Sequence, residues 1–184
     1  MHHRAAALVP HREYSPFALC QTHGVEGTAT AGAWLALGTL VGRDELVASV
    51  VAQVFEHRLV TLTGVGGVGK TRLVMEVAAA ALPHFRDGVW FVDLAAVYDA
   101  AAVADAVASM LGIAPQADTP VAQTLIDALA NQQLLLVLDN CEHVVGAAAE
   151  LAHMVLSRSD RTRNVARAAA GDRRARRHCS VTSR

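Results

Sequence analysis

The sequence feature that most constrains the fold is a glycine-rich stretch that joins an apolar run to helix-forming sequence. Residues 60–73 read VTLTGVGGVGKTRL, and Gly64-x-x-x-x-Gly69-Lys70-Thr71 matches the phosphate-binding loop (Walker A) at every defined position. Glycine lets the backbone curl tightly enough to point several N–H groups at a phosphate chain. A helix directly after the loop adds its N-terminal dipole and free amides. We therefore predict a strand, a phosphate-binding loop and a helix.

Two side chains of this loop have specific predicted roles. Lys70 would reach the β- and γ-phosphates as a point charge, and the Thr71 hydroxyl would bind Mg²⁺. Lys70 is the only lysine in the chain, so the match does not arise from a lysine-rich background. The alternative is a plain glycine-rich turn between a strand and a helix. The complete pattern in a strand–loop–helix context favours nucleotide binding.

Hydrophobic periodicity predicts strands and helices that alternate around this loop. Short apolar or β-branched runs indicate strands, and apolar residues spaced three and four apart indicate helices. Such alternation implies βαβ crossovers and a parallel sheet, in a three-layer α/β/α fold. The predicted strands are 58–63, 88–94 and 134–138, and the predicted helices are 44–56, 71–82, 99–111, 121–130 and 144–156.

The apolar strand predicted at 134–138 ends in Asp139-Asn140 and supplies a second part of the site. A buried strand can deliver a carboxylate to the edge of a sheet, where Asp139 would hold Mg²⁺ or its water shell. Asp at a strand end can also simply form a turn. Because this one follows a complete phosphate loop in an α/β chain, we favour the metal role.

The charge of the chain is divided unevenly. Residues 157–184 hold nine arginines and two aspartates, a net charge of +7, whereas the rest of the chain carries −8. This Arg-rich tail has no apolar period, so it could bind nucleic acid, be a solvated disordered tail, or be a stretch out of the reading frame. No aromatic residue lies among the arginines to stack on bases, which disfavours nucleic-acid binding.

Cysteine use and hydropathy bear on the compartment. Cys20, Cys141 and Cys179 lie far apart without a C-x-x-C spacing, which favours a reducing cytoplasm over a disulfide framework or a zinc site. No apolar run approaches the roughly 20 residues of a membrane span. The apolar residues 29–41 are followed by Arg43 and not by a small-residue cleavage site, so a signal peptide is not expected.

Four segments together resemble the nucleotide-binding domain of signal-transducing STAND ATPases, above all the NB-ARC-like module of bacterial transcriptional regulators of the LuxR and antibiotic-regulator types. The resemblance covers residues 39–156 and implies a P-loop NTPase domain that binds ATP or ADP with Mg²⁺. It also implies a switch that ADP holds closed and that self-associates on binding ATP, with DNA bound only through other domains. The segments are LVGRDEL (40–46), LVTLTGVGGVGKTRLVMEVA (59–78), GVWFVDLA (88–95) and LLLVLDNCEHV (134–144).

The resemblance also implies which residues form the site. The segment before the first helix would lie near the adenine, the loop would surround the phosphates, and the strand-end carboxylate would assist Mg²⁺. The implied nucleotide-binding residues are Val41, Gly42, Arg43, Gly64, Val65, Gly66, Gly67, Val68, Gly69, Lys70, Thr71 and Arg72, with Thr71 and Asp139 at Mg²⁺ and Lys70 and Asp139 as catalytic residues.

The chain departs from the family at Asn140, where many related ATPases carry a second acidic residue. An amide cannot accept a proton from water, so we expect slow or absent ATP hydrolysis. Glu142 is nearby, but its spacing suits a turn or a helix start better than a catalytic base.

A second departure concerns the strand that ends in T-S-R in the family and lies between the magnesium strand and the phosphate-loop strand. Here Thr182-Ser183-Arg184 comes well beyond the family's spacing, and little between indicates a strand. We therefore expect a partial domain at 39–156, with only the first three strands and their helices. Residues 1–38 would be a disordered or linker extension, and the Arg-rich tail at 157–184 would be disordered or outside the domain's pattern. A sheet without its central strand should be marginally stable and bind nucleotide weakly.

The leading hypothesis is an ATP- or ADP-binding, Mg²⁺-dependent switch module of a bacterial transcriptional regulator. One alternative is a P-loop phosphotransferase for a small molecule, which would need an acceptor pocket and arginines that close over the phosphates. Another is a basic-tailed DNA-binding or interaction protein with a vestigial loop, although nothing in the sequence resembles a helix-turn-helix.

Overall fold

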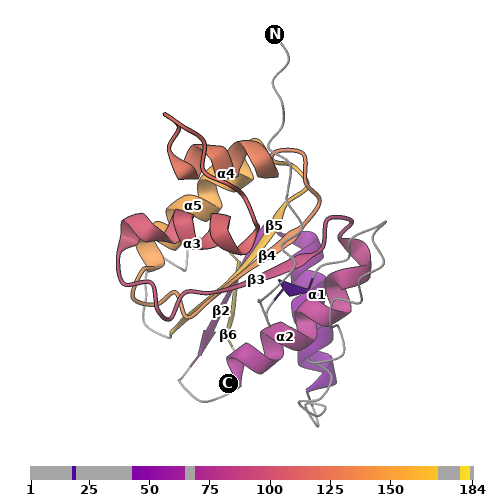
Figure 1. The fold of residues 1–184 in the computed structure, drawn as a ribbon. Coiled ribbons are helices and arrows are strands. Elements are labelled where there is room, and N and C mark those ends of the chain that lie inside the picture. The colour runs from indigo at the N-terminus through magenta and orange to yellow at the C-terminus, as the bar shows by residue number, and fades with distance from the viewer. Residues whose placement is uncertain (1–17, 20–42, 65–68, 170–178, 183–184) are drawn as a thin grey trace.

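The computed structural model describes residues 18–19, 43–64, 69–169 and 179–182, with side chains described at 43–64 and 69–162. Helices cover both faces of a six-stranded sheet, which confirms the predicted three-layer α/β/α class (Figure 1). Six residues of the predicted site lie outside this description, and they are Val41, Gly42, Val65, Gly66, Gly67 and Val68.

Each strand and helix predicted from periodicity is present, and the helix predicted at 99–111 is divided into a 3-10 turn and an α-helix. Asp99 begins that turn, and its Oδ1 accepts a hydrogen bond from Ala101 N at 2.9 Å. In chain order the elements are β1 (Ala18–Leu19), α1 (Asp44–Glu56), β2 (Leu59–Gly64), α2 (Lys70–Ala81), η2 (Leu82–His84), β3 (Val89–Asp93), η3 (Ala100–Ala102), α3 (Val103–Met110), α4 (Val121–Leu129), β4 (Leu135–Asp139), α5 (Val145–Arg158), β5 (Arg163–Ala169) and β6 (Cys179–Thr182).

The strand order is β1-β3-β4-β5-β2-β6, and every neighbouring pair is parallel except β1 with β3. Strand β5 therefore lies between β2, which leads into the loop, and β4, which ends at Asp139. The prediction of a sheet with only three strands, and with no strand between the loop strand and the Asp139 strand, was therefore wrong. The observed pairing also brings part of the Arg-rich tail (β5 and β6) and two residues of the segment 1–38 (β1) into the sheet.

Strand β5 was not predicted because its sequence does not carry the usual pattern of a buried strand. Its sequence RNVARAA has no apolar run, and a buried parallel strand normally shows one. The strand is instead held by backbone pairing, with Val165 opposite Val60 on β2 and Val137 on β4. Without β5 the N–H and C=O groups along both neighbours would lack partners, and the free-energy cost of that loss favours any segment that can pair.

Buried polar contacts fix the turn that leads into β5. Thr162 N donates to Ser159 Oγ at 3.1 Å, and Thr162 Oγ1 donates to Gln132 O at 3.2 Å, with both hydroxyl residues fully buried. From the start of β2, Arg58 Nη2 donates to the carbonyl oxygens of Leu156 and Ser159. These contacts tie the end of α5 to the starts of β2 and β4, so the chain enters the sheet between those two strands.

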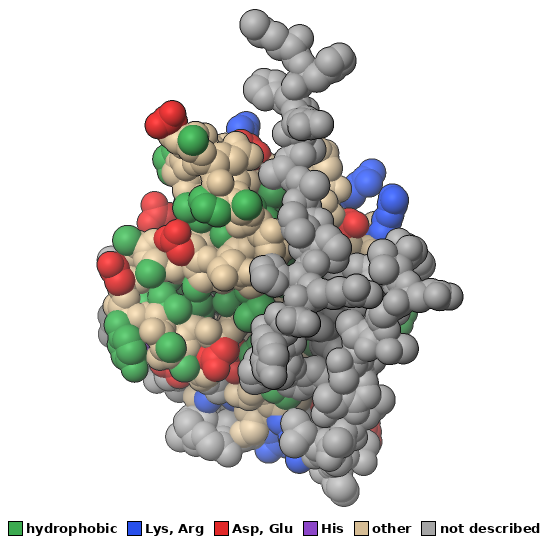
Figure 2. Space-filling view, viewed as in Figure 1, with side chains coloured by type: hydrophobic (Ala, Val, Ile, Leu, Met, Phe, Trp, Pro, Cys, Tyr) green, Lys and Arg blue, Asp and Glu red, His purple; other side chains and the backbone are tan. Residues whose placement is uncertain are grey.

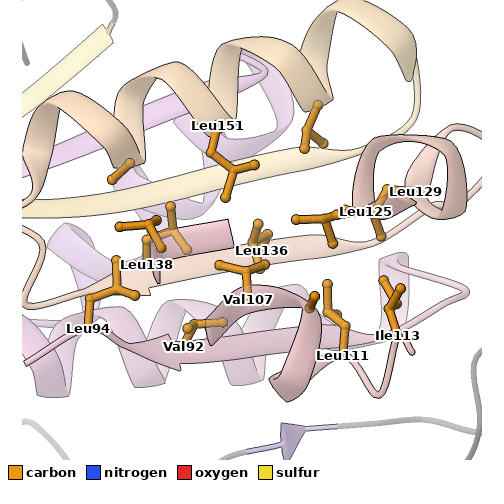
Figure 3. Packing of buried hydrophobic residues seen from close by; sticks show 14 of the residues in the cluster. Val92, Leu94, Val107, Leu111, Ile113, Leu125, Leu129, Leu136, Leu138 and Leu151 are labelled. Carbon is orange, nitrogen blue, oxygen red and sulfur yellow. The ribbon is translucent and has the colours of Figure 1, made fainter. Parts of the chain in front are cut away.

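The sheet buries apolar side chains on both faces, because side chains alternate along a strand. On β4, Leu136 and Leu138 pack under α3, α4 and α5, whereas Leu135 and Val137 pack toward α1 and α2. Figure 3 shows the first cluster, in which Leu136 lies among side chains of the covering helices. This two-sided burial explains the continuous apolar sequence of β4.

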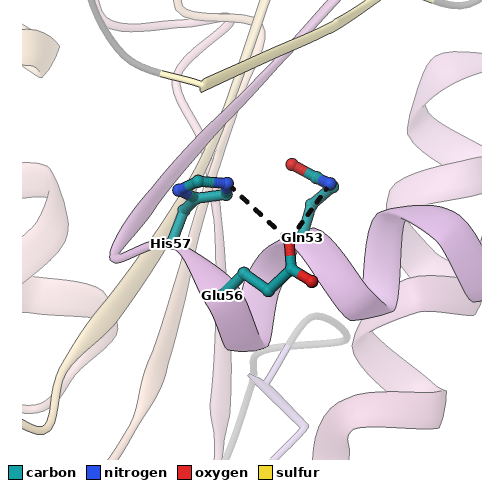
Figure 4. A network of polar contacts seen from close by, with 3 residues as sticks. All are labelled: Gln53, Glu56 and His57. Carbon is teal, nitrogen blue, oxygen red and sulfur yellow. Dashed lines mark hydrogen bonds and ion pairs between the residues drawn. The ribbon is translucent and has the colours of Figure 1, made fainter.

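The outer surface carries polar contacts of little energetic weight. At the end of α1, Gln53 Nε2 donates to Glu56 Oε2 at 3.5 Å, and His57 Nε2 lies 3.9 Å from the same oxygen (Figure 4). Exposed contacts of this kind contribute about 0–1 kcal/mol. In the space-filling view the acidic side chains lie singly and do not form one patch (Figure 2). No helix within the described ranges combines the length and apolarity needed to cross a bilayer.

Candidate functional site

The candidate site lies at the carboxyl edge of the sheet, where β2 ends at Gly64 and α2 begins at Lys70. Gly69 precedes the helix with φ 82° and ψ 26°, a left-handed conformation. That conformation costs a residue with a Cβ roughly 1–2 kcal/mol and costs glycine almost nothing. The second glycine of the pattern is therefore required by the backbone itself.

Lys70 is buried, with only 4% of its surface exposed. Its Nζ donates to Gly64 O at 2.7 Å, which links the last residue of β2 to the first residue of α2. A buried ammonium group needs polar partners to offset its lost hydration. The chain thus places its only lysine at the junction of β2 and α2.

The start of α2 presents backbone donors. Its first helical hydrogen bond runs from Leu73 N to Gly69 O at 3.0 Å, so the amides of the preceding three residues have no acceptor within the helix. No side chain caps this end among the described residues. Thr71 and Arg72, both half-buried, occupy the first turn.

Two arginines add positive charge near the loop. A Cβ built on Gly69 would lie 3.9 Å from Arg43 Nη1, so this guanidinium lies beside the end of the loop. Arg72 Nε is buried and has no hydrogen-bond partner among the described residues. Buried donors without acceptors are uncommon in native structures, and Arg58 Nε at the start of β2 is a second one in the described part of the chain.

Asp139 ends β4 at the same edge and is 1% exposed. One strand, β5, separates β4 from β2, so Asp139 lies about 10 Å across the sheet from the loop strand. Its Oδ1 accepts a hydrogen bond from Asn140 N at 2.9 Å. The sheet order therefore brings Lys70 and Asp139 to one edge of the sheet.

The structure adds Asp93, which sequence reasoning missed. Asp93 ends β3 in register with Asp139, and its Oδ1 accepts from Asn140 Nδ2 at 2.8 Å and from Ala95 N at 2.9 Å. Asn140 has a φ of 53°, in the left-handed region that Asn tolerates better than most residues. The sequence held one signal, because the apolar runs of β3 and β4 both end in Asp. Glu142 lies exposed in the turn that follows.

A hollow of about 250 Å³ lies at the opposite edge of the sheet, at the amino ends of the strands. We do not assign the candidate site to it, because its lining includes neither a helix start nor a loop glycine. The lining residues are Phe55, His84, Phe85, Gln133, Asp160 and Arg161.

The residues at the carboxyl edge suit an anionic ligand that carries a divalent cation. A buried ammonium, the amides of a helix start and two guanidinium groups attract phosphate oxygens. A hydroxyl from Thr71 and a carboxylate from Asp139 are the oxygen ligands that Mg²⁺ prefers. The donor set therefore fits a magnesium-bound nucleotide.

Comparison with known proteins places the chain among relatives that are much longer. A protein of Mycobacterium tuberculosis strain H37Rv, whose name proposes an HTH-type transcriptional regulator, is 44% identical over 96 residues, which are 52% of this chain and 11% of that protein. An uncharacterised protein of the same strain is 36% identical over 120 residues, 65% of this chain and 30% of that protein. The chain thus spans about a tenth and about a third of these two relatives.

Among solved structures, the ORC2 protein of Aeropyrum pernix in its ADPNP–ADP complexes matches 74% of this chain and 43% of its own, with a TM-score of 0.55 and 17% identity. That likeness supports the fold. A family model described as an AAA domain matches residues 53–177, which is more than half of the chain and includes the loop, β4 and β5. The chain therefore belongs to the AAA domain family of P-loop NTPases.

Proposed function

We propose that this domain binds ATP or ADP with Mg²⁺ at the loop between β2 and α2 and acts as a nucleotide-dependent switch. The observation that carries the proposal is the buried Lys70, held against Gly64 O at the uncapped start of α2. A buried ammonium group at the first residue of a helix puts positive charge beside the helix-start amides, where phosphate oxygens are attracted.

Each described residue of the site has a role in this proposal. Lys70 Nζ and the first amides of α2 bind the β- and γ-phosphates, while Arg43 and Arg72 add positive charge around them. Thr71 Oγ1 and Asp139 hold Mg²⁺, which neutralises phosphate charge when it is bound. Val41, Gly42 and residues 65–68 complete the proposed contacts through the adenine side and the loop backbone.

Slow hydrolysis suits a switch. The residue after Asp139 is Asn140, and its Nδ2 donates to Asp93, so the amide offers no proton acceptor comparable to a carboxylate. A nucleotide that persists for long periods can report a cellular state, whereas rapid turnover suits a motor.

The regulatory context is proposed from the relatives and from the resemblance to STAND and NB-ARC-like domains. One relative carries a name that proposes HTH-type transcriptional regulation, and this chain matches only 11% of its length. We propose that the domain works in the cytoplasm within a LuxR-type or related regulator, self-associates on binding ATP, and contacts DNA only through other domains.

The test is a titration of labelled ATP and ADP, with and without Mg²⁺, against wild type and Lys70→Ala. Arg86→Ala is the matched control, because Arg86 is an exposed cation in the turn before β3, at the opposite edge of the sheet. We expect Lys70→Ala to weaken binding at least about tenfold, the loss expected for one charge-assisted phosphate contact of about 1.5–3 kcal/mol. Arg86→Ala should bind as wild type does. Equal binding by wild type and Lys70→Ala would refute the proposed site.

A further inference from the structure

We propose that the hollow at the amino edge of the sheet binds a free amino acid with an apolar side chain. Asp160 binds the ammonium group of this ligand, Arg161 binds its carboxylate, and the ring of Phe55 covers its side chain. The site lies at the opposite edge of the sheet from the phosphate-binding loop. The inference therefore goes beyond the proposed function and does not depend on nucleotide binding.

The place and size of the hollow suit a small ligand. It lies where the end of α1, the turn η2 and the turns that lead into β4 and β5 come together. Its volume is about 250 Å³. Pockets that take drug-sized ligands measure roughly 300–1,000 Å³, so this hollow suits a smaller molecule, of the size of a single amino acid.

One wall of the hollow is aromatic. Phe55 lines it and is 39% exposed, which is unusual for a large apolar side chain in the described part of the molecule. The ring lies nearly parallel to that of buried Phe85, with centroids 6.1 Å apart, and edge-on to the imidazole of His84 at 4.9 Å. These two contacts hold the ring in place. An apolar ligand side chain packed on it would remove apolar surface from water.

Two opposite charges line the same hollow. Asp160 and Arg161 are exposed, and neither makes an ion pair with another residue in the described part of the chain. A ligand with one charge would be attracted by one of these side chains and repelled by the other. A free amino acid carries an ammonium group and a carboxylate on the same carbon, so it satisfies both charges at once.

Gln133 supplies a further polar group to the hollow. Its Nε2 donates to His84 O at 3.2 Å, which leaves the side-chain oxygen to accept a hydrogen bond from the ligand's ammonium group. The backbone of Gln133 is fixed as well, because its N–H donates to Asp87 Oδ2 at 2.7 Å. The amide is therefore held beside the aromatic wall.

The turn that carries the two charges is fixed by buried hydroxyl groups. Ser159 and Thr162 flank Asp160 and Arg161, and the two hydroxyl oxygens lie 2.9 Å apart. Thr162 Oγ1 also donates to Gln132 O at 3.2 Å, which ties this turn to the residue before Gln133. A site held in this way before the ligand arrives loses less conformational entropy on binding.

The experiment is an NMR titration of the isotope-labelled chain, without nucleotide, with L-leucine and two analogues. Isocaproate lacks the ammonium group of leucine, and isopentylamine lacks its carboxylate. We expect leucine to bind with a Kd of about 1 mM and to shift the amide signals of residues 133, 160 and 161. Each analogue should bind about fivefold more weakly, since a half-exposed charge pair contributes up to about 1 kcal/mol.

Paired variants test which side chain binds which charge. Asp160→Asn should weaken leucine and isopentylamine about fivefold and leave isocaproate unchanged, whereas Arg161→Gln should weaken leucine and isocaproate and leave isopentylamine unchanged. Asp105→Asn and Arg158→Gln are the matched controls, because both residues are exposed and neither lines the hollow. The controls should bind leucine as wild type does.

The outcomes separate this inference from the proposed function. No saturable shift at about 20 mM leucine overturns the inference, as does binding that neither Asp160→Asn nor Arg161→Gln weakens. Equal binding of leucine and both analogues would show an apolar contact only and would also overturn it. Lys70→Ala should bind leucine as wild type does. A chain that binds Mg-ATP but not leucine would leave the nucleotide site intact and refute the amino-edge site alone.

Discussion

Proline at position 165 should strongly destabilise the domain if β5 is the central strand. Val165 is paired on both sides, opposite Val60 of β2 and Val137 of β4. Proline has no N–H and its ring crowds the neighbouring backbone, so in a central strand it removes a ladder hydrogen bond and pushes the strands apart.

The free-energy cost of Val165→Pro comes mainly from backbone groups that lose their hydrogen-bond partners. One buried carbonyl acceptor without its donor costs about 1–3 kcal/mol, and the displaced strands add to that, giving at least about 3 kcal/mol in total. A domain of this size shifts its Tm by about 2–4 °C per kcal/mol, so the expected loss is at least about 6 °C. Against a typical stability of about 5–15 kcal/mol, that is a large fraction.

The assay is thermal unfolding followed by circular dichroism for wild type, Val165→Pro and Gln116→Pro. Gln116 lies in an exposed loop between α3 and α4, so its proline variant controls for the substitution itself. A Val165→Pro protein that melts within about 1 °C of the Gln116→Pro protein would refute the placement of β5 between β2 and β4.

Two further substitutions test the loop and the metal position. Gly69→Ala leaves the new Cβ in ordinary contact with Arg43 at 3.9 Å, so its cost of about 1–2 kcal/mol comes from the left-handed backbone, and both Tm and nucleotide affinity should fall. Asp139→Asn keeps an oxygen that can accept from Asn140 N but removes the charge, so titration calorimetry should show ATP binding that no longer strengthens when Mg²⁺ is added.

The elements around the site were predictable because their sequences carry the period of their structure. The first four residues of β4 are all apolar because the strand is covered on both faces, and the loop pattern lies between a strand and a helix. Lys70 and Asp139 could be assigned to one edge because parallel strands share the direction in which they end.

Strand β5 could not be predicted in the same way. RNVARAA lacks both an apolar run and a regular alternation, so its position depends on neighbouring strands that need hydrogen-bond partners and on the buried turn at Ser159 and Thr162. The pairing of Asp93 with Asn140 was hidden for a related reason. The two residues are distant in sequence, and only the register between β3 and β4 brings them together.

In the proposed complex, the loop between β2 and α2 holds the phosphates of a nucleotide while Asp139 assists its metal. Amide hydrogen exchange of the wild-type chain with and without Mg-ADP tests this most directly. We expect slower exchange at the start of α2 and at the end of β4, with no change around Phe55 and Phe85 at the opposite edge. Protection confined to that opposite edge, or no protection at Lys70 and its neighbours at saturating Mg-ADP, would contradict it.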